Sequence, residues 1–199
     1  MGAKYEFTNE TMNFDDYILH RIKRLSDNKL GGWIEKEDNL SQDGNCWVDG
    51  NAKVFGDVKV TGNAQIYDDA IVSGGAKVYG NAKVYGEAFV FDNAKVYDNA
   101  SIFDNANVYD NAEVYGNAEI RGNAQAYDNA EVYDNAIIDN NAEIGGNAKV
   151  YGNARVYNYA NVYDNAEVYG KAKVYKYAEV YCNARIFDDV WIDGDVDWS

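Results

Sequence analysis

The sequence predicts an all-β protein, a single-stranded parallel β-helix in which three six-residue repeats complete each coil. Three observations lead to this prediction: similar hexads recur 18 residues apart, apolar and polar residues alternate within each hexad, and the hexads stay in frame from Asn45 to Ser199. The clearest copies read NAKVYD at 93–98, NAEVYG at 111–116 and NAEVYD at 129–134. If three hexads make one coil, residues 18 apart stack directly above one another at the spacing of β-strands.

The six columns of the repeat assign each position to one side of a strand. Column two is Ala in 22 of 26 hexads and column four is Val or Ile in 24, whereas column three is mostly charged or amide and column five is Tyr or Phe in 18. Columns two and four share one face of an extended segment, so Ala and Val should point inward and the aromatic and charged residues outward. A helix is excluded because a six-residue period does not follow a 3.6-residue turn. The 26 hexads give about 8 to 9 coils and a rod about 40 Å long.

The bends come from columns six and one. Gly or Asp fills column six in 21 of 25 complete hexads, and Asn fills column one in 17 of 26. These residues tolerate positive φ and hydrogen-bond to nearby backbone, so a bend is expected after every strand. The acidic residues of column six could also suggest calcium binding, but the glycine-rich nonapeptide calcium pattern is absent from the sequence. Turn formation is therefore the preferred interpretation.

The first 44 residues precede the repeat and are predicted to form a hairpin-like cap, with the β-helix over 45–199. KYEFT at 4–8 and YILHRIKRL at 17–25 read as two strands around a turn-like NETMNFDD. Such a cap would cover the first coil, whose edge would otherwise offer unpaired backbone groups to other chains. The apolar contacts expected at the two ends are Trp33, Ile34 and Leu40 for the cap, and Trp191 and Trp198 for the far end.

The three faces of the predicted prism differ in column five. One face is an unbroken row of six Tyr ended by Phe187, whereas the second is interrupted by Arg121 and Asp139 and the third by Gly145. Stacked tyrosines stabilise a β-ladder by about 0.2 to 1 kcal/mol per pair. An unbroken row exceeds that need and indicates an interface, because Tyr offers large contact area with few rotors. The candidate interface residues are Tyr79, Tyr97, Tyr115, Tyr133, Tyr151 and Tyr169, with Phe89 and Phe91 beside Ile71 as a second patch for a subunit or for the folded-back leader.

Column three of the tyrosine face carries charges in blocks. Like charges stacked on neighbouring strands are unfavourable, so a partner with the opposite blocks is expected to relieve them. No self-pairing register follows from their order. In chain order these residues are Lys59, Lys77, Lys95, Glu113, Glu131, Lys149, Glu167 and Arg185.

Composition excludes several partners. The formal net charge is −15, which argues against a phosphate-binding surface, so no nucleic-acid partner is expected. The sequence contains no secretory signal and no apolar run long enough to cross a membrane, so a cytoplasmic protein without a membrane partner is expected. Cys46 and Cys182 should lie about 36 Å apart at about 4.8 Å per coil, too far for a disulfide, and two free thiols fit a reducing compartment.

The spacing of aliphatic and small residues carries a resemblance. Val96 with Ala100 and Val114 with Ala118 place an aliphatic residue four positions before a small one. This pattern resembles the hexapeptide-repeat, left-handed β-helix superfamily, which has the trimeric acyltransferase-like fold, and the resemblance covers 45–199. It implies a left-handed coil. The segment 20–48 looks like the leader of a narrower group of bacterial and phage hexapeptide proteins, labelled transferase or polymer-forming.

The resemblance also bears on activity. The superfamily's acyltransferases generally use a catalytic His within or near the coils and often a loop between hexads, and its carbonic anhydrases hold zinc with three His. This sequence has one His, His20, in the leader, and no hexad carries an insertion. His20 is interpreted as an ordinary strand residue rather than a catalytic one, and no metal, catalytic residue or cofactor is predicted. Cys182 lies at a turn, but no base for a reactive thiol is identifiable in the sequence.

These observations predict a non-enzymatic structural or binding protein that acts through the tyrosine face, by forming a dimer or trimer or by docking another protein. One alternative is a hexapeptide-type acyltransferase with a ligand between subunits, which micromolar binding of acetyl-CoA would indicate. Another is an acidic, phage-encoded decoy of a host protein in the bacterial cytoplasm, whose partner would be lost in high salt.

Overall fold

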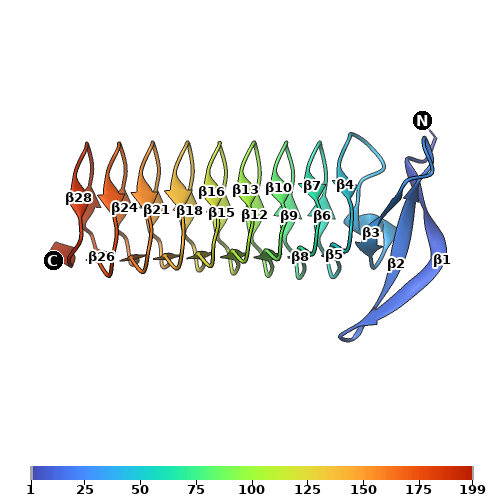
Figure 1. Ribbon diagram of the computed structural model, residues 1–199, viewed down its shortest axis with the longest axis horizontal. Coiled ribbons are helices and arrows are strands. Elements are labelled where there is room, and N and C mark those ends of the chain that lie inside the picture. Colours follow the sequence, from blue (N-terminus) through green and yellow to red (C-terminus); the bar gives the residue numbers. More distant parts are fainter. Residues whose placement is uncertain (1, 199) are drawn as a thin grey trace.

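The computed structural model describes residues 2–198, and it describes side chains for residues 2–196. The chain forms a parallel β-solenoid of about nine turns, with a hairpin at the N-terminal end and the C-terminus at the opposite end (Figure 1). Within the described residues the strands form three sheets, named here sheet A with twelve strands, sheet B with eight and sheet C with nine. The predicted all-β parallel β-helix is confirmed.

Most strands of the solenoid are two residues long, and each turn contributes one strand to each sheet. Sheet B contains β6 (Lys59–Val60), β9 (Lys77–Val78), β12 (Lys95–Val96), β15 (Glu113–Val114), β18 (Glu131–Val132), β21 (Lys149–Val150), β24 (Glu167–Val168) and β27 (Arg185–Ile186). Sheet C contains β4 (Trp47–Val48), β7 (Gln65–Ile66), β10 (Lys83–Val84), β13 (Ser101–Ile102), β16 (Glu119–Ile120), β19 (Ile137–Ile138), β22 (Arg155–Val156), β25 (Lys173–Val174) and β28 (Trp191–Ile192). Sheet A contains β1 (Tyr5–Phe14), β2 (Tyr17–Arg24), β3 (Leu30–Ile34), β5 (Lys53–Val54), β8 (Ile71–Val72), β11 (Phe89–Val90), β14 (Asn107–Val108), β17 (Gln125–Ala126), β20 (Glu143–Ile144), β23 (Asn161–Val162), β26 (Glu179–Cys182) and β29 (Val196–Trp198).

The register of the sheets follows the repeat. Lys95 pairs with Glu113, and Val96 with Val114, in parallel strands of sheet B. Because residues 18 apart are neighbours, identical columns share one environment from turn to turn. This shared environment explains why the best copies of the hexad recur at three-hexad intervals.

Side chains at the turns also form ladders. The amide of Asn81 donates to Asn99 Oδ1 at 3.0 Å, and the amide of Asn99 donates to Asn117 Oδ1 at 3.1 Å. In column six, Asp98 and Gly116 have positive φ values of 56° and 69°. Gly or Asp is suited to this position because neither is strongly disfavoured in the left-handed region. The turn interpretation of column six therefore agrees with the geometry.

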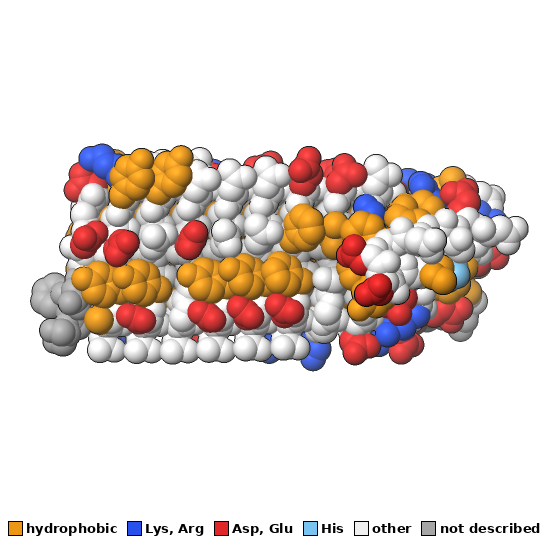
Figure 2. Space-filling view, turned by 90° about the horizontal axis from the view of Figure 1, so that it is seen from below, with side chains coloured by type: hydrophobic (Ala, Val, Ile, Leu, Met, Phe, Trp, Pro, Cys, Tyr) orange, Lys and Arg blue, Asp and Glu red, His pale blue; other side chains and the backbone are white. Residues whose placement is uncertain are grey.

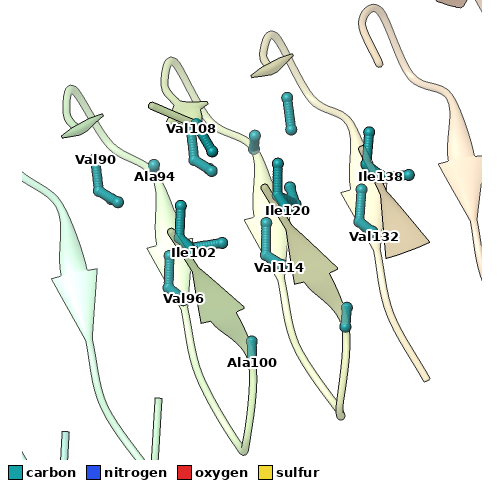
Figure 3. Close-up of a cluster of buried hydrophobic side chains, with 14 of the residues drawn as sticks. Val90, Ala94, Val96, Ala100, Ile102, Val108, Val114, Ile120, Val132 and Ile138 are labelled. Carbon is teal, nitrogen blue, oxygen red and sulfur yellow. The ribbon is translucent and has the colours of Figure 1, made fainter. Parts of the chain in front are cut away.

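The core is the narrow interior of the prism. The Ala of column two and the Val or Ile of column four are completely buried in nearly every turn. Figure 3 shows Val96, Val114 and Val132 from successive turns of sheet B pointing inward beside Ile102, Ile120 and Ile138 of sheet C. Burying one such aliphatic side chain contributes about 1.5 to 3 kcal/mol, so the repeated column is the main source of stability.

The leader adds an antiparallel hairpin to the N-terminal edge of sheet A. β1 pairs with β2, β2 with β3, and β3 pairs in parallel with β5. Figure 1 shows the hairpin folded across this end of the solenoid, with its tip toward the side where β5 and β8 lie. Of the contacts predicted for the cap, Ile34 and Leu40 are fully buried or nearly so, and Trp33 is 8% exposed.

The turn predicted for the leader is shorter than expected. Of NETMNFDD at 9–16, only Asp15 and Asp16 form the turn, because β1 continues to Phe14 and the reversal begins at Asp15, which has a φ of 49°. Packing explains the difference: the Phe14 ring lies 5.6 Å from the Phe55 ring, and Met12 contacts the buried cluster around Phe55. These tertiary contacts outweigh the turn preference of the Asn and Asp residues.

The C-terminal turn departs from the repeat. β29 pairs with β26 sixteen residues away rather than 18, with Val180 opposite Val196. The prediction that Trp191 closes this end is wrong, since its side chain is 56% exposed and lies over the outer surface beside Tyr175 and Lys173. Column three points outward, so Trp191 cannot reach the core. The side chain of Trp198, predicted to act with it, lies outside the described residues.

In the part of the chain that the structure describes, no helix has the length and apolar character needed to cross a membrane.

Candidate binding face of sheet B

The tyrosines of column five form a continuous stack on the outside of sheet B. The ring centroids of Tyr97 and Tyr115 are 4.9 Å apart with planes 5° from parallel, and Tyr115 and Tyr133 are 4.8 Å apart with planes 3° from parallel. The same stacking continues to Tyr79 at one end and Phe187 at the other. The strand spacing imposes this distance, because successive rings project from equivalent positions one turn apart. The structure thus brings all six predicted tyrosines into one row.

Glutamates of column three fix part of this row. The hydroxyl of Tyr97 donates to Glu113 at 3.1 Å, and the hydroxyl of Tyr115 donates to Glu131 at 3.1 Å. In each case the acceptor is 16 residues later, on the next turn. The Tyr151 hydroxyl makes the same bond to Glu167 at 3.1 Å. A ring stacked on both sides and bonded at its tip has little rotamer freedom left, so these tyrosine side chains are held in one orientation.

Six of the eight charged residues of column three are paired with each other within the face, although unrelieved blocks were expected. Lys95 contacts Glu113 at 2.6 Å, Lys149 contacts Glu131 at 2.8 Å, and Arg185 contacts Glu167 at 3.0 Å. Each block ends beside the opposite charge on the neighbouring strand. Long side chains reach along the sheet to make these pairs. These six residues therefore do not require a partner with complementary blocks. Lys59 pairs with Asp38 of the leader at 3.4 Å, and among residues 2–196 no carboxylate forms an ion pair with Lys77.

Stacking also occurs on the other two sheets. On sheet C, the ring of Tyr85 stacks between those of Tyr67 and Phe103. On sheet A, the ring centroids of Tyr109 and Tyr127 are 5.4 Å apart. Figure 2 views the solenoid from below, the side where Figure 1 places β5, β8 and β26, and shows a row of apolar and aromatic side chains with a gap in it. Stacking itself thus serves the fold on every face. Among the described residues, the stack on sheet B differs from those on the other two sheets only in being unbroken.

The second predicted patch is divided between two roles. Ile71 contacts the cluster of Leu19, Trp33 and Phe55 beneath the leader hairpin. Phe89 is the neighbour of Ile71 on the next strand and is 40% exposed, just beyond the hairpin. Phe91 stacks on Tyr109 at 4.9 Å, as part of the aromatic row of sheet A.

Two exposed aromatics were not predicted from the sequence. Tyr159 and Tyr177 stack at 5.2 Å on the corner between sheets C and A, and they are 52% and 74% exposed. Both occupy column one, where Asn is the usual residue. That replacement, repeated after 18 residues, was the signal that could have identified them.

The remaining candidates have structural environments. His20 is half-buried in β2, with its ring 5.0 Å from the ring of Phe7 and its backbone paired with Ile34. Asp98 of column six accepts a hydrogen bond from the backbone N–H of Gly116 at 3.4 Å, which ties one turn to the next. Cys46 is buried, Cys182 is half-buried at the last residue of β26, and neither forms a disulfide. Among residues 2–198, no group of three or more His, Cys, Asp or Glu side chains is placed to hold a metal ion.

The tyrosine hydroxyls bonded to glutamates resist ionisation. Partial burial, followed by the hydrogen bond to Glu167 and its charge, raises the pKa of Tyr151 to about 12. Burial and the charge of Glu179 raise the pKa of Tyr163 to about 12 in the same way. The pKa values of Tyr97 and Tyr115 are also raised, chiefly by burial and then by their glutamates.

These shifts predict that the solenoid loses stability in alkali. Because the folded-state pKa values exceed the ordinary 10.0, the stabilisation is fully present below about pH 10 and is lost as the pH rises through about 12. Tyrosinate absorbance and circular dichroism, followed together, should show the Glu-bonded tyrosines ionising late and with loss of β-structure. Ionisation of every tyrosine near pH 10, with the circular dichroism unchanged, would contradict this.

Two stretches of the chain, residues 64–80 and 148–164, match the family model described as the YdcK beta solenoid repeat. No curated protein is significantly similar to the chain. Each matched stretch is nearly one turn of the solenoid, and both begin at column two. The match and the fold together show a β-solenoid repeat protein.

Proposed function

We propose that this chain is a structural or binding protein that docks a protein surface along the tyrosine row of sheet B, and that the occupant is a second copy of the chain. The observation that carries the proposal is the unbroken stack from Tyr79 to Phe187. Tyr is favoured at interfaces because it offers a large amphipathic surface for few rotatable bonds.

The state of the rings supports docking. The tyrosines of the row are half-buried, so their outer edges remain accessible. Their orientation is already fixed by stacking on both sides, and for Tyr97, Tyr115 and Tyr151 by the bond to a glutamate. Association therefore costs less side-chain entropy than it would for mobile side chains.

The character of the face favours a second copy. A flat row of one residue type can face itself, as an isologous interface requires. Its acids and bases are largely paired with each other along the row. The face itself therefore does not select a strongly charged partner. Two copies, each with a net charge of −15, repel at long range, so self-association through this face should strengthen as salt screens that repulsion.

The test is the molar mass of the full chain by multi-angle light scattering. Tyr115→Ser with Tyr133→Ser is expected to reduce the mass of the oligomer toward the 22.2 kDa of one chain, because the centre of the row is removed. The circular dichroism should keep its β-type spectrum. The matched control is Tyr109→Ser with Tyr127→Ser, which removes an equivalent stacked pair from sheet A and should leave the mass unchanged.

Three outcomes would reject self-association through this face. They are a monomeric parent chain at every salt concentration, an unchanged mass in the sheet B variant, and an equal loss of mass in the sheet A control. If the parent is a monomer, capture of a different protein that the sheet B variant fails to capture would retain the docking face and replace the occupant.

We infer further that the solenoid is a left-handed member of the hexapeptide-repeat superfamily. The support is the repeat itself, with a six-residue period and an aliphatic residue four positions before a small one, as at Val114 and Ala118. An experimental electron-density map of the coils would test the handedness directly.

A further inference from the structure

The aromatic row of sheet C has a gap that opens a hollow. Tyr85 stacks on Phe103 at 4.9 Å, and Tyr157 stacks on Tyr175 at 5.5 Å, but Arg121 and Asp139 occupy the two positions between these stacks. In the stacks on either side, an aromatic ring fills this position of the surface. The side chain of Asp139 is too short to fill it. The resulting cavity has a volume of about 160 Å³ and is lined by Arg121, Ile137, Asp139, Arg155, Tyr157 and Lys173.

The charge of this lining is positive, although the whole chain is strongly acidic. Arg121 is neutralised by Glu119 at 3.1 Å and by Asp139 at 3.0 Å, so Asp139 is already engaged. Arg155 and Lys173 are direct neighbours on β22 and β25. Two like charges opposite each other on adjacent strands are unfavourable.

Neither of these neighbours has a carboxylate to neutralise it. Among residues 2–196, no carboxylate oxygen lies within ion-pair distance of the Arg155 guanidinium or the Lys173 ammonium. Lys173 instead places its ammonium 3.8 Å from the centre of the Trp191 ring. On sheet B, by contrast, Lys95, Lys149 and Arg185 each contact a glutamate. The hollow on sheet C is thus a place where an external anion would supply the missing negative charge.

The other walls are not polar. Ile137 lies between Glu119 and Arg155 in the register of column three, and it is the aliphatic member of this lining. Tyr157, 18 residues after Asp139, also lines the hollow. A ligand with a compact apolar or planar body beside its anionic group would therefore contact these two residues while its oxygens reach the cations.

We propose that this hollow is a binding site for a small oxyanion, a carboxylate or a phosphate monoester on a compact apolar or planar body. Arg155 binds two oxygens of the anion through its planar guanidinium, and Lys173 supplies a second positive charge. Arg121, held by Asp139 and Glu119, forms the far wall. The site lies on a different sheet from the proposed docking face and does not depend on it.

Titration of the full chain followed by ¹H–¹⁵N NMR tests the site, with phenyl phosphate, benzoate and inorganic phosphate as probes. Phenyl phosphate or benzoate should shift the amides of Ile137, Arg155, Tyr157 and Lys173, with a dissociation constant of about 1 mM or tighter. Inorganic phosphate should bind several-fold more weakly, because it makes no contact with Ile137 and Tyr157. A preference for phenyl phosphate over benzoate would assign a phosphate ester, and the reverse a carboxylate.

The matched variants separate the site from general attraction of anions. Arg155→Gln with Lys173→Gln should weaken binding at least about 10-fold, since the charged hydrogen bonds to the anion are lost. Lys53→Gln with Lys83→Gln, which removes the same charge outside the hollow and outside sheet B, should leave the affinity within about twofold. Absence of shifts at the four amides, or equal weakening by both double variants, would overturn the proposal.

Discussion

Insertion of a single Ser between Glu113 and Val114 is expected to unfold the solenoid from that turn onward. The extra residue lies inside β15, where Val114 is fully buried and its neighbours on both sides are in register. A shift of one position exchanges the inward and outward faces of a strand, so the charged column would enter the core and the valines would face solvent. The expected loss is more than about 4 kcal/mol, the range associated with disruption of a core.

The effect should be local along the rod. Each turn contacts only its neighbours, so the leader and the turns before residue 113 keep their own contacts. Limited proteolysis with mass spectrometry is therefore expected to give a protected N-terminal fragment ending near the insertion. The β-type circular dichroism signal should fall roughly in proportion to the fraction of the turns that follow the insertion.

Two controls distinguish the frame from the mere addition of residues. A second copy of residues 96–113 inserted at the same point adds a whole turn and restores every column, so this longer chain should unfold at a temperature close to that of the parent. The same single Ser placed after Asp43, which is exposed and precedes the first hexad, should also have little effect. A Ser insertion in β15 that melts with the parent would show that the hexad frame does not hold the structure together.

The coil could be predicted because every turn repeats the same local environment. The columns of Ala and Val give the interior, and the Gly or Asp of column six gives the turn, without reference to distant residues. The tyrosine row followed from the same register. The structure places Tyr97 and Tyr115 one above the other, as the 18-residue spacing required.

Contacts that cross between turns or come from the leader were less predictable. Stacked blocks of charge suggested repulsion, but the flexible Lys95 side chain reaches Glu113 at the block boundary. The length of β1 depended on packing between Phe14 and Phe55, which are 41 residues apart in the numbering. The hollow of sheet C was marked in the sequence only as an interruption by Arg121 and Asp139, and its cations, from different turns, meet only in the folded chain.

The N-terminal edge of sheets A and B shows how the leader replaces a missing turn. Elsewhere in the coils, backbone N–H groups of one turn donate hydrogen bonds to carbonyl groups in columns six and two of the next turn. For example, the N–H of Asp57 donates to the carbonyl of Gly74, and the N–H of Lys59 donates to the carbonyl of Ala76. At the edge, the side-chain amide of Asn39 takes over this role. It donates to the carbonyls of Gly56 at 3.0 Å and Val58 at 3.2 Å.

Replacement of this amide, Asn39→Leu, is therefore expected to lower the free energy of unfolding by about 3 kcal/mol. Asn39 is fully buried, and its Oδ1 also accepts the N–H of Lys36 at 3.0 Å. Leu has a similar volume but no polar atoms, so three backbone groups would lose their partner, and an unsatisfied buried group costs about 1 to 3 kcal/mol. Partial access of water to Lys36 should keep the total near the lower end of the summed range, which is about 3 to 9 kcal/mol. Chemical denaturation followed by circular dichroism measures the change.

The same substitution at an exposed amide provides the control. Asn99→Leu removes one member of the amide ladder at a corner of the prism, where Asn81 and Asn117 can exchange their lost bonds for water. Its expected cost is below about 1 kcal/mol. If Asn39→Leu costs no more than Asn99→Leu, the edge carbonyls are satisfied in another way, and the side chain does not substitute for a turn. A large cost confined to Asn39 would show that one buried amide closes the end of the solenoid where the repeat itself has no preceding strand.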